Sequence, residues 1–142
     1  MIRPFKPADT PDVLHIWKAA NLQSHAFIPP SYWEEHEAYV RDICLPAAET
    51  FVAIVHQRPV GFISIVDHSF IGGLFVAPGW QSRGIGASLL DDCQQRFPFL
   101  ALCAYEENPR AIAFYRSHGF SIVRRQTDAN TGHAEVRMEW RI

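Results

Sequence analysis

Apolar residues recur at helical spacing just after the N-terminus. Val13, Trp17 and Ala20 share one face of the segment that begins at Thr10. Thr10 is a suitable cap, and Pro11 suits a first helical position. We therefore expect an amphipathic helix from Thr10 to about Ala20.

A second helical pattern follows the polar stretch "NLQSHAFIPP". Ser31 and Glu34 have the spacing of a capping box, which predicts a helix that ends near Leu45. Its inner side would carry Trp33, Val40 and Cys44.

Strand patterns occupy the N-terminus and the middle of the chain. "MIRPF" resembles a short strand, in which Pro4 requires an edge or a strand start. "TFVAIV" and "VGFISIV" flank "HQRP" and are rich in β-branched and aromatic residues, which predicts an antiparallel hairpin. A fourth strand, Phe70 to Val76, follows the turn "DHS".

The second half alternates helices and strands. Ile85, Leu89 and Cys93 mark a helix from about Gly84 to Arg96, with Pro98 just beyond it. "FLALCA" is apolar enough to be a strand buried on both faces.

The next helix and two strands complete the chain. Asn108 can cap a helix from Pro109 to His118, which Gly119 would end. Strands at 121–125 and 134–140 then flank the polar loop "QTDANTG". The order predicts an α/β (α+β) fold, with a mixed, mostly antiparallel central sheet of about seven strands flanked by about four helices on both faces, in one domain spanning residues 1–142.

Composition excludes several classes of protein. The 142 residues carry a net charge of −2 without a basic run, which argues against a nucleic-acid binder. No apolar stretch approaches the roughly 20 residues that span a bilayer, and the N-terminus lacks the apolar core of a signal peptide. We expect a cytoplasmic protein, monomeric or homodimeric, without a membrane partner.

Cysteine and histidine spacing gives no sign of a metal. Cys44, Cys93 and Cys103 are odd in number, lack C-x-x-C spacing and lie in apolar patterns, so we expect buried free thiols. The seven histidines form no H-x-x-x-H pair, and we predict no metal site.

Glycines concentrate where "FVAPGWQSRGIGASLL" passes from strand to helix. A helix N-terminus offers unpaired N–H groups and partial positive charge, and glycines let a bulky anion approach them. Gln81, Ser82 and Arg83 add side-chain donors, so a phosphate-bearing ligand fits. The alternative is a tight turn with incidental glycines.

Two familiar phosphate motifs fail in this stretch. Gly79 and Gly84 have Walker A spacing, but Ile85 stands where the lysine must be. In the dinucleotide fingerprint, Leu89 replaces the third glycine. Nucleotide hydrolysis and a Rossmann site are therefore disfavoured.

The pattern Q-x-x-G-x-G at Gln81, Gly84 and Gly86, with "NPRAIAFYRSHGF" from Asn108 to Phe120, resembles the GCN5-related N-acetyltransferase (GNAT) family. The resemblance covers most of the chain. "HAFI" at His25 to Ile28 is similar to a stretch in small bacterial peptide or protein N-acetyltransferases of this family.

The resemblance implies that acetyl-CoA is the acetyl donor and that it lies along the strand from Phe70 to Val76 and the glycine loop. The loop would cradle the pyrophosphate, and the strand would bind the pantetheine arm by β-strand addition. Gly72 and Gly73 favour a bulge that parts this strand from "FLALCA" and opens a slot. The implied cofactor-binding residues are Leu74, Phe75, Val76, Gln81, Ser82, Arg83, Gly84, Ile85, Gly86, Ala87, Asn108 and Tyr115.

Tyr115 matches the general acid of the family. With an ordinary pKa of about 10, it stays protonated at neutral pH and can serve a leaving thiolate. The alternative is a core tyrosine on the helical stripe of Ile112. Asn108 matches a cofactor-binding position but also suits a helix cap, and Arg110 either reaches CoA phosphates or lies on a solvated face.

The general base of many members, a glutamate, is absent, because glycines stand at positions 72 and 73. His25, His68, Glu106 or a relayed water are the substitutes. Deprotonating a lysine of pKa about 10.4 at pH 7 costs about 4.6 kcal/mol, against about 1 for an α-amine of pKa about 7.8. A more acidic amine would therefore need less help.

Acceptor recognition is expected from the loop between the first two helices and from the turn "DHS". His25, Phe27, Tyr32 and Trp33 are candidates, and each has packing as its alternative role. The "HAFI" likeness favours a peptide or protein amine, a lysine or an N-terminus, over an aminoglycoside.

Three functions remain to be weighed. The first is an acetyl-CoA-dependent N-acetyltransferase acting on such an amine or on a small-molecule amine. The second is a noncatalytic acyl-CoA-binding regulatory module, and the third is a protein that binds another phosphorylated cofactor such as a flavin.

Overall fold

Seven strands and four longer helical segments make up the computed structural model, which describes residues 1–142. The strands are β1 (Ile2–Pro4), β2 (Glu49–Val55), β3 (Arg58–Val66), β4 (Phe70–Val76), β5 (Phe99–Tyr105), β6 (Ser121–Thr127) and β7 (Ala134–Arg141). The helices are α1 (Thr10–Ser24), α2 (Pro30–Tyr39), α3 (Leu45–Ala47), α4 (Ile85–Arg96) and α5 (Pro109–Ser117), with short turns η1 (Pro7–Asp9), η2 (Val40–Cys44) and η3 (Pro78–Trp80).

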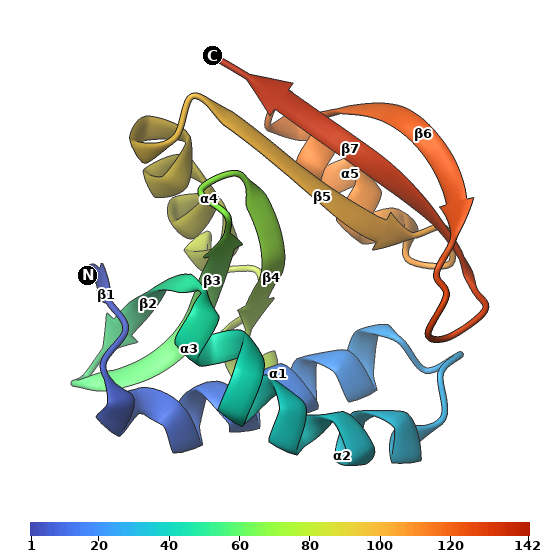
Figure 1. The fold of residues 1–142 in the computed structure, drawn as a ribbon. Helices are drawn as coiled ribbons and strands as arrows, with labels where there is room; N and C mark the ends of the chain where they lie inside the picture. Colours follow the sequence, from blue (N-terminus) through green and yellow to red (C-terminus); the bar gives the residue numbers. More distant parts are fainter.

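All seven strands form one sheet in the order β1-β2-β3-β4-β5-β7-β6. Every neighbouring pair is antiparallel except β4 and β5, which are parallel. Figure 1 shows α1, α2 and α3 on one side of the sheet and α4 and α5 on the other. The predicted mixed, mostly antiparallel sheet with helices on both faces is confirmed.

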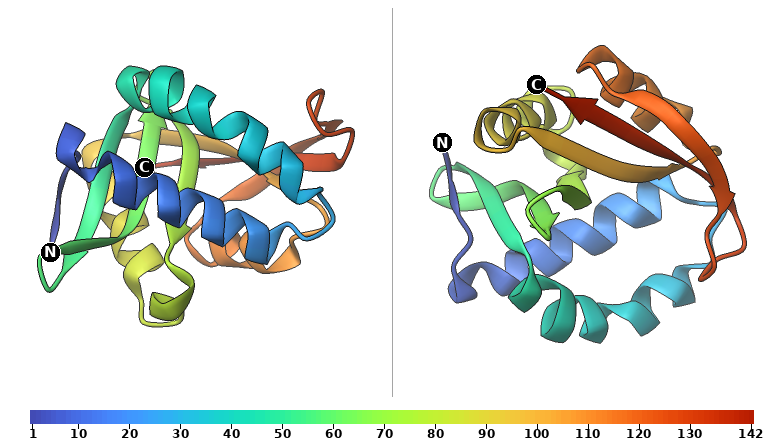
Figure 2. Two further views of the ribbon diagram at one scale, coloured as in Figure 1. Left: turned by 90° about the horizontal axis from the view of Figure 1, so that it is seen from below. Right: turned by 45° about the horizontal axis from the view of Figure 1, so that its top comes forward.

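Two apolar cores lie on opposite faces of the sheet. One packs α4 and α5 against the sheet and contains Leu89, Tyr115 and Met138. The other packs α1 and α2 and contains Trp17 and Trp33. The two views of Figure 2 show the helices on both sides. The helices therefore cover both faces of the sheet.

The hairpin between β2 and β3 is tighter than predicted. Its turn is His56 and Gln57, both with positive φ, so only part of "HQRP" lies outside the strands. Pro59 pairs with Ile54 next to a register shift at which Val60 of β3 is the extra residue. A proline without an N–H donor is tolerated at such an irregularity.

The starts of the first two helices differ from the sequence prediction. Thr10 is not a cap: its Oγ1 donates to the Pro7 carbonyl, and η1 leads directly into α1. The capping box at Ser31 and Glu34 is also wrong, because α2 begins at Pro30 without a side-chain cap. Proline at a first helical position has no N–H to satisfy, which removes part of the need for one.

The second helical segment contains a π turn, η2, that moves its inner side by one residue. Trp33 is buried as expected, but Val40 is half-buried and Cys44 is exposed. Leu45 is buried in place of Cys44. A π turn takes an extra residue, so the helical spacing used for the prediction fails after position 40.

The three cysteines are free thiols, but one of the three is fully buried where the sequence predicts burial for all. Cys93 is buried, Cys103 is half-buried and Cys44 is exposed. Burial raises the pKa of the Cys93 thiol to about 12.

No helix of the chain combines the length and apolar character needed to cross a bilayer.

Candidate active site

A cleft of about 890 Å³ lies between β4 and β5. These strands pair through Phe70 and Ala101, where the Ala101 N–H donates to the Ser69 carbonyl over 2.8 Å. They diverge beyond that pair, as Figure 1 shows. The edge of β4 that faces the cleft therefore has no strand partner along most of its length.

The predicted bulge in β4 is present. Ser64 of β3 pairs with Gly73 and Ile65 pairs with Ile71, so Gly72 is the extra residue. A Cβ on Gly73 would lie 2.8 Å from the Phe75 ring, so a side chain there would push the ring aside. The glycine pair thus bends the strand and leaves room for Phe75 over its backbone.

One end of the cleft, the loop end (Gln81–Ala87), is made by the glycine loop and the start of α4. Gly84 precedes α4 with φ +80°, and a Cβ on it would meet nothing within 4 Å, so it is required by backbone conformation rather than by space. The Gln81 amide donates to the Val76 carbonyl over 3.1 Å and fixes the start of the loop. The first amides of α4 have no intrahelical acceptor and are available to an anion.

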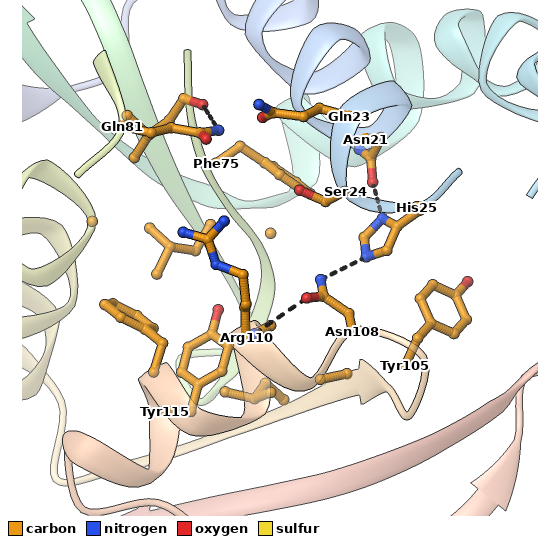
Figure 3. A pocket seen from close by; sticks show the side chains of 18 of the residues that line it. Asn21, Gln23, Ser24, His25, Phe75, Gln81, Tyr105, Asn108, Arg110 and Tyr115 are labelled. Carbon is orange, nitrogen blue, oxygen red and sulfur yellow. Dashed lines mark hydrogen bonds between the residues drawn. The ribbon is translucent and has the colours of Figure 1, made fainter. Parts of the chain in front are cut away.

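The predicted cofactor residues gather in this cleft with one exception. Leu74, Phe75, Val76, Gln81, Ser82, Gly84, Ile85, Gly86, Ala87, Asn108 and Tyr115 all line it. Arg83 does not; its guanidinium stacks over the Trp80 ring at 4.8 Å from the centroid. Arg110 is exposed and lines the cleft, and Figure 3 shows its guanidinium above the Tyr115 hydroxyl.

The position of Tyr115 is compatible with both of the roles considered for it, a core tyrosine and a general acid. Its ring is 8% exposed and packs edge-on to Phe114 and Phe120. Its hydroxyl makes no hydrogen bond within the chain and points into the cleft (Figure 3). Burial raises the pKa of this phenol above its ordinary value. The group is therefore a protonated donor that faces the cavity.

The other end of the cleft, the aromatic end, contains His25, Phe27, Trp33 and Tyr105. The His25 ring stacks on Trp33 at 5.9 Å and meets the edges of Phe27 and Tyr105 at 5.6 and 5.2 Å between ring centroids. His25, Trp33 and Tyr105 line the cleft, and Phe27 packs behind them. The Trp33 Nε1 is buried without a hydrogen-bond partner.

Hydrogen bonds connect His25 to both halves of the molecule. Its Nδ1 lies 2.8 Å from Asn21 Oδ1, and its Nε2 lies 3.1 Å from Asn108 Nδ2 (Figure 3). Asn108 also caps α5, since its Oδ1 accepts from the Ala111 N–H over 3.2 Å. Burial lowers the pKa of His25. Of the two roles weighed for Asn108, the cap is present, and its amide nitrogen is directed at His25.

The candidate general bases differ in whether they line the cleft. His68 is exposed and bonds to Glu49 at 3.0 Å, and Glu106 pairs with Arg125 at 2.7 Å; neither lines the cleft. His25 lines it, but both ring nitrogens are hydrogen-bonded. Tyr32, a candidate for the acceptor side, does not line the cleft and stacks on His36 at 4.0 Å.

Sequence reasoning missed the two carboxylates that line the cleft, Glu107 and Glu135. Glu107 pairs with His133 at 2.8 Å. Glu135 accepts from the Gln126 amide and lies close to Cys103. Burial, followed by the charge of Glu135, raises the pKa of Cys103 to about 11. Glu107 lies in the loop between β5 and α5, and no local pattern marks Glu135, because β-strand pairing alone brings β7 beside β5.

Comparison with known proteins identifies relatives of this chain. The family model described as Acetyltransferase (GNAT) domain matches residues 21–142. A relative from Escherichia coli, named peptidyl-lysine N-acetyltransferase YiaC, is 38% identical over 123 residues, which cover 87% of this chain and 84% of that protein.

Solved structures share the architecture. Apo-form YjaB from Escherichia coli superimposes with a TM-score of 0.86 at 26% identity, covering 99% of this chain and 96% of that one. The PaiA N-acetyltransferase of Thermoplasma acidophilum, solved in complex with coenzyme A, gives a TM-score of 0.83 at 18% identity, covering 100% and 98%. At that identity, the second likeness concerns the fold.

Proposed function

The chain belongs to the GNAT acetyltransferase family, and from this premise we propose that it acetylates lysine side chains of peptides or proteins, with residues 1–142 acting as one domain. It is an N-acetyltransferase that takes its acetyl group from acetyl-CoA. The observation that carries the proposal is that one cleft contains the glycine loop, the Tyr115 hydroxyl and an aromatic end. The 38% identity to a protein named peptidyl-lysine N-acetyltransferase supports lysine as the acceptor.

Main-chain groups would hold the cofactor. The amides at the loop end suit a diphosphate, since they combine free N–H groups with the positive end of α4. The unpaired edge of β4 suits the amides of pantetheine, which would extend the sheet as an added strand does. Arg110 lines the cleft and is free to meet a phosphate.

Tyr115 is the proposed general acid. In the transfer, the amine nitrogen bonds to the acetyl carbon and the carbon–sulfur bond breaks. The second proton that the nitrogen loses on becoming an amide restores the phenol once the departing sulfur has received the phenolic proton. The raised pKa of Tyr115 keeps that proton in place at neutral pH. The hydroxyl has no competing partner within the chain, so it is free to donate.

Glu135 is the proposed acceptor of the amine proton. A lysine must lose a proton before attack, at a cost of about 4.6 kcal/mol at pH 7. Glu135 and Glu107 are the carboxylates that line the cleft, and Glu107 is already paired with His133. Glu135 would take the proton directly or through water, while both charges attract the lysine ammonium.

The test is an acetylation assay with defined peptides. We expect CoA release and a one-acetyl mass increase with a peptide that has a blocked N-terminus and one internal lysine. A lysine-free peptide with a free N-terminus and a polyamine should react more slowly. A faster reaction of either would overturn the lysine assignment.

Tyr115→Phe tests the mechanism. We expect kcat to fall by about 10²- to 10⁴-fold, with acetyl-CoA affinity nearly unchanged, because the ring remains and one donor is lost. Tyr39→Phe is the matched control, since Tyr39 is exposed on α2 and does not line the cleft. An unchanged kcat in Tyr115→Phe would remove the tyrosine from the mechanism.

A further inference from the structure

A chain of hydrogen bonds crosses the aromatic end of the cleft. It runs from Asn21 on α1, through His25, to Asn108 at the start of α5. No other side-chain hydrogen bond joins residues 1–76 to residues 99–142. The two halves share the short β4–β5 pairing at the opposite, closed side of the cleft. These hydrogen bonds therefore connect residues 1–76 to residues 99–142 at the end of the cleft where β4 and β5 are not paired.

Backbone groups at both ends fix the donor and the acceptor of each hydrogen bond in the series from Asn21 through His25 to Asn108. The Ala111 N–H can only donate, so the atom of Asn108 that faces it is Oδ1 and the amide nitrogen faces His25. The His25 Nε2 must then accept. At the far end, the Trp17 carbonyl can only accept, so it faces Asn21 Nδ2 at 2.8 Å.

The imidazole is consequently neutral, with its proton on Nδ1. Asn21 presents Oδ1 to His25, so Nδ1 must donate to it. A second proton on Nε2 would face the Asn108 NH₂ group, donor against donor. The tautomer follows from geometry, because the two backbone groups at the ends have no alternative role.

We propose that His25 is a positioning residue: held as the neutral Nδ1–H tautomer between Asn21 and Asn108, it ties the end of α1 to the start of α5 and sets the geometry of the cleft. Tyr115 lies two helical turns after Asn108, close to the same side of α5. A shift at the start of α5 would therefore move the proposed general acid. The inference rests on the proposed acetyl transfer for its effect on rate, but not for the tautomer.

The groups around His25 determine the pH range over which its hydrogen bonds to Asn21 and Asn108 persist. Trp33 of α2 and Phe27 cover the ring without charge. Tyr105 of β5 presents a phenol that donates to Asp128.

Beside Asn108, Glu107 is paired with His133. Burial lowers the His25 pKa, so the tie is complete at neutral pH and is lost as the pH falls through that lowered pKa.

Nuclear magnetic resonance tests the tautomer without any acceptor substrate. In long-range ¹H–¹⁵N spectra, His25→Gln identifies the His25 signals by their disappearance. We expect a protonated Nδ1 and an unprotonated Nε2 at pH 7. A proton on Nε2 would overturn the inference, whether or not the protein acetylates lysine.

Asn108→Asp reverses the polarity of one link and sharpens the test. Aspartate can still cap α5, but its second oxygen accepts where the amide donated. We expect the His25 pKa to rise and Nε2 to become protonated. An unchanged His25 signal would show that Asn108 does not set the tautomer and would overturn the inference.

Kinetics separate positioning from general-base catalysis. We expect His25→Ala to lower kcat/KM by about tenfold to a hundredfold through misplaced groups. His25→Gln keeps an oxygen that can accept from Asn108 but has no basic nitrogen, so it should retain most of the activity. His15→Gln, on the exposed side of α1, is the matched control.

The outcomes are distinct. Equal losses in His25→Gln and His25→Ala, with both variants folded by circular dichroism, would make His25 a base and overturn the positioning role. If wild-type protein acetylates no lysine peptide, the proposed function fails, while the nuclear magnetic resonance test of His25 still decides the inference.

Discussion

The two ends of the cleft offer a ligand different kinds of group. At the loop end, main-chain amides of consecutive residues lie around Gly84, whose left-handed φ creates the turn. At the aromatic end, side chains from α1, α2, β5 and α5 converge, with His25 and Asn108 bonded although they are 83 residues apart. The first end depends on local backbone conformation, whereas the second depends on the whole fold.

This difference has chemical consequences. Main-chain amides can bind a diphosphate independently of the identity of the acceptor, so the loop end suits a constant cofactor. Side chains decide which amine enters and how its proton leaves. Substitutions at the loop end should therefore change cofactor affinity, and those at the aromatic end should change acceptor turnover and its pH dependence.

The largest pH-dependent effect is expected from Glu135→Gln. Without the carboxylate, the lysine ammonium has to lose its proton unaided, and we expect kcat/KM for the lysine peptide at pH 7 to fall by about 10²-fold or more. The deficit should shrink as the pH rises toward 10, because the free amine then forms in solution. Acetyl-CoA affinity should not change.

Glu139→Gln is the control for that substitution. Glu139 lies on the same strand, accepts from Arg137 at 3.0 Å and does not line the cleft. Its replacement should leave kcat/KM unchanged. A deficit of Glu135→Gln that stays constant with pH would show that Glu135 does not take the proton.

A smaller effect is expected at the loop end, where two glycines form a matched pair. A Cβ on either Gly79 or Gly84 would meet nothing within 4 Å, but Gly84 alone has a positive φ. Alanine in that conformation costs about 1–2 kcal/mol. We expect Gly84→Ala to weaken acetyl-CoA binding about tenfold, since about 1.4 kcal/mol corresponds to that factor.

Gly79→Ala should bind acetyl-CoA as the wild type does. Isothermal titration of acetyl-CoA into each variant measures the comparison. Equal affinities of the two variants would mean that the turn at Gly84 does not shape the cofactor site. Turnover at saturating acetyl-CoA should be similar in both, because neither glycine belongs to the aromatic end.

The same difference explains how far the sequence could predict the molecule. The Asn108 cap and the glycine turn depend on a few consecutive residues, so their patterns predict them. The β4 bulge is marked by its own glycine pair. The acid candidate Tyr115 belongs to a motif that includes this cap.

The missed features require information from distant residues. Glu135 enters the cleft because β7 pairs with β5, and its own sequence gives no sign of that. The His25 tie needs Asn108, and the π turn at η2 shows no marker that periodicity can detect. Helical spacing therefore misplaced Cys44, although it placed Trp33 correctly.

The smallest expected effect is on thiol reactivity, and it tests whether the cofactor lies between the two ends. Cys103 lines the cleft on β5, and its pKa is raised to about 11, so little thiolate is present at pH 8 and labelling by a maleimide should be slow. Exposed Cys44 should react first, and buried Cys93 only after unfolding. Saturating acetyl-CoA should slow the labelling of Cys103 several-fold further and leave the labelling rate of Cys44 unchanged. Mass spectrometry of the labelled peptides measures both rates. An unprotected Cys103 would place the cofactor outside the gap between β4 and β5, and the loop end would then bind its ligand without directing it toward the aromatic end.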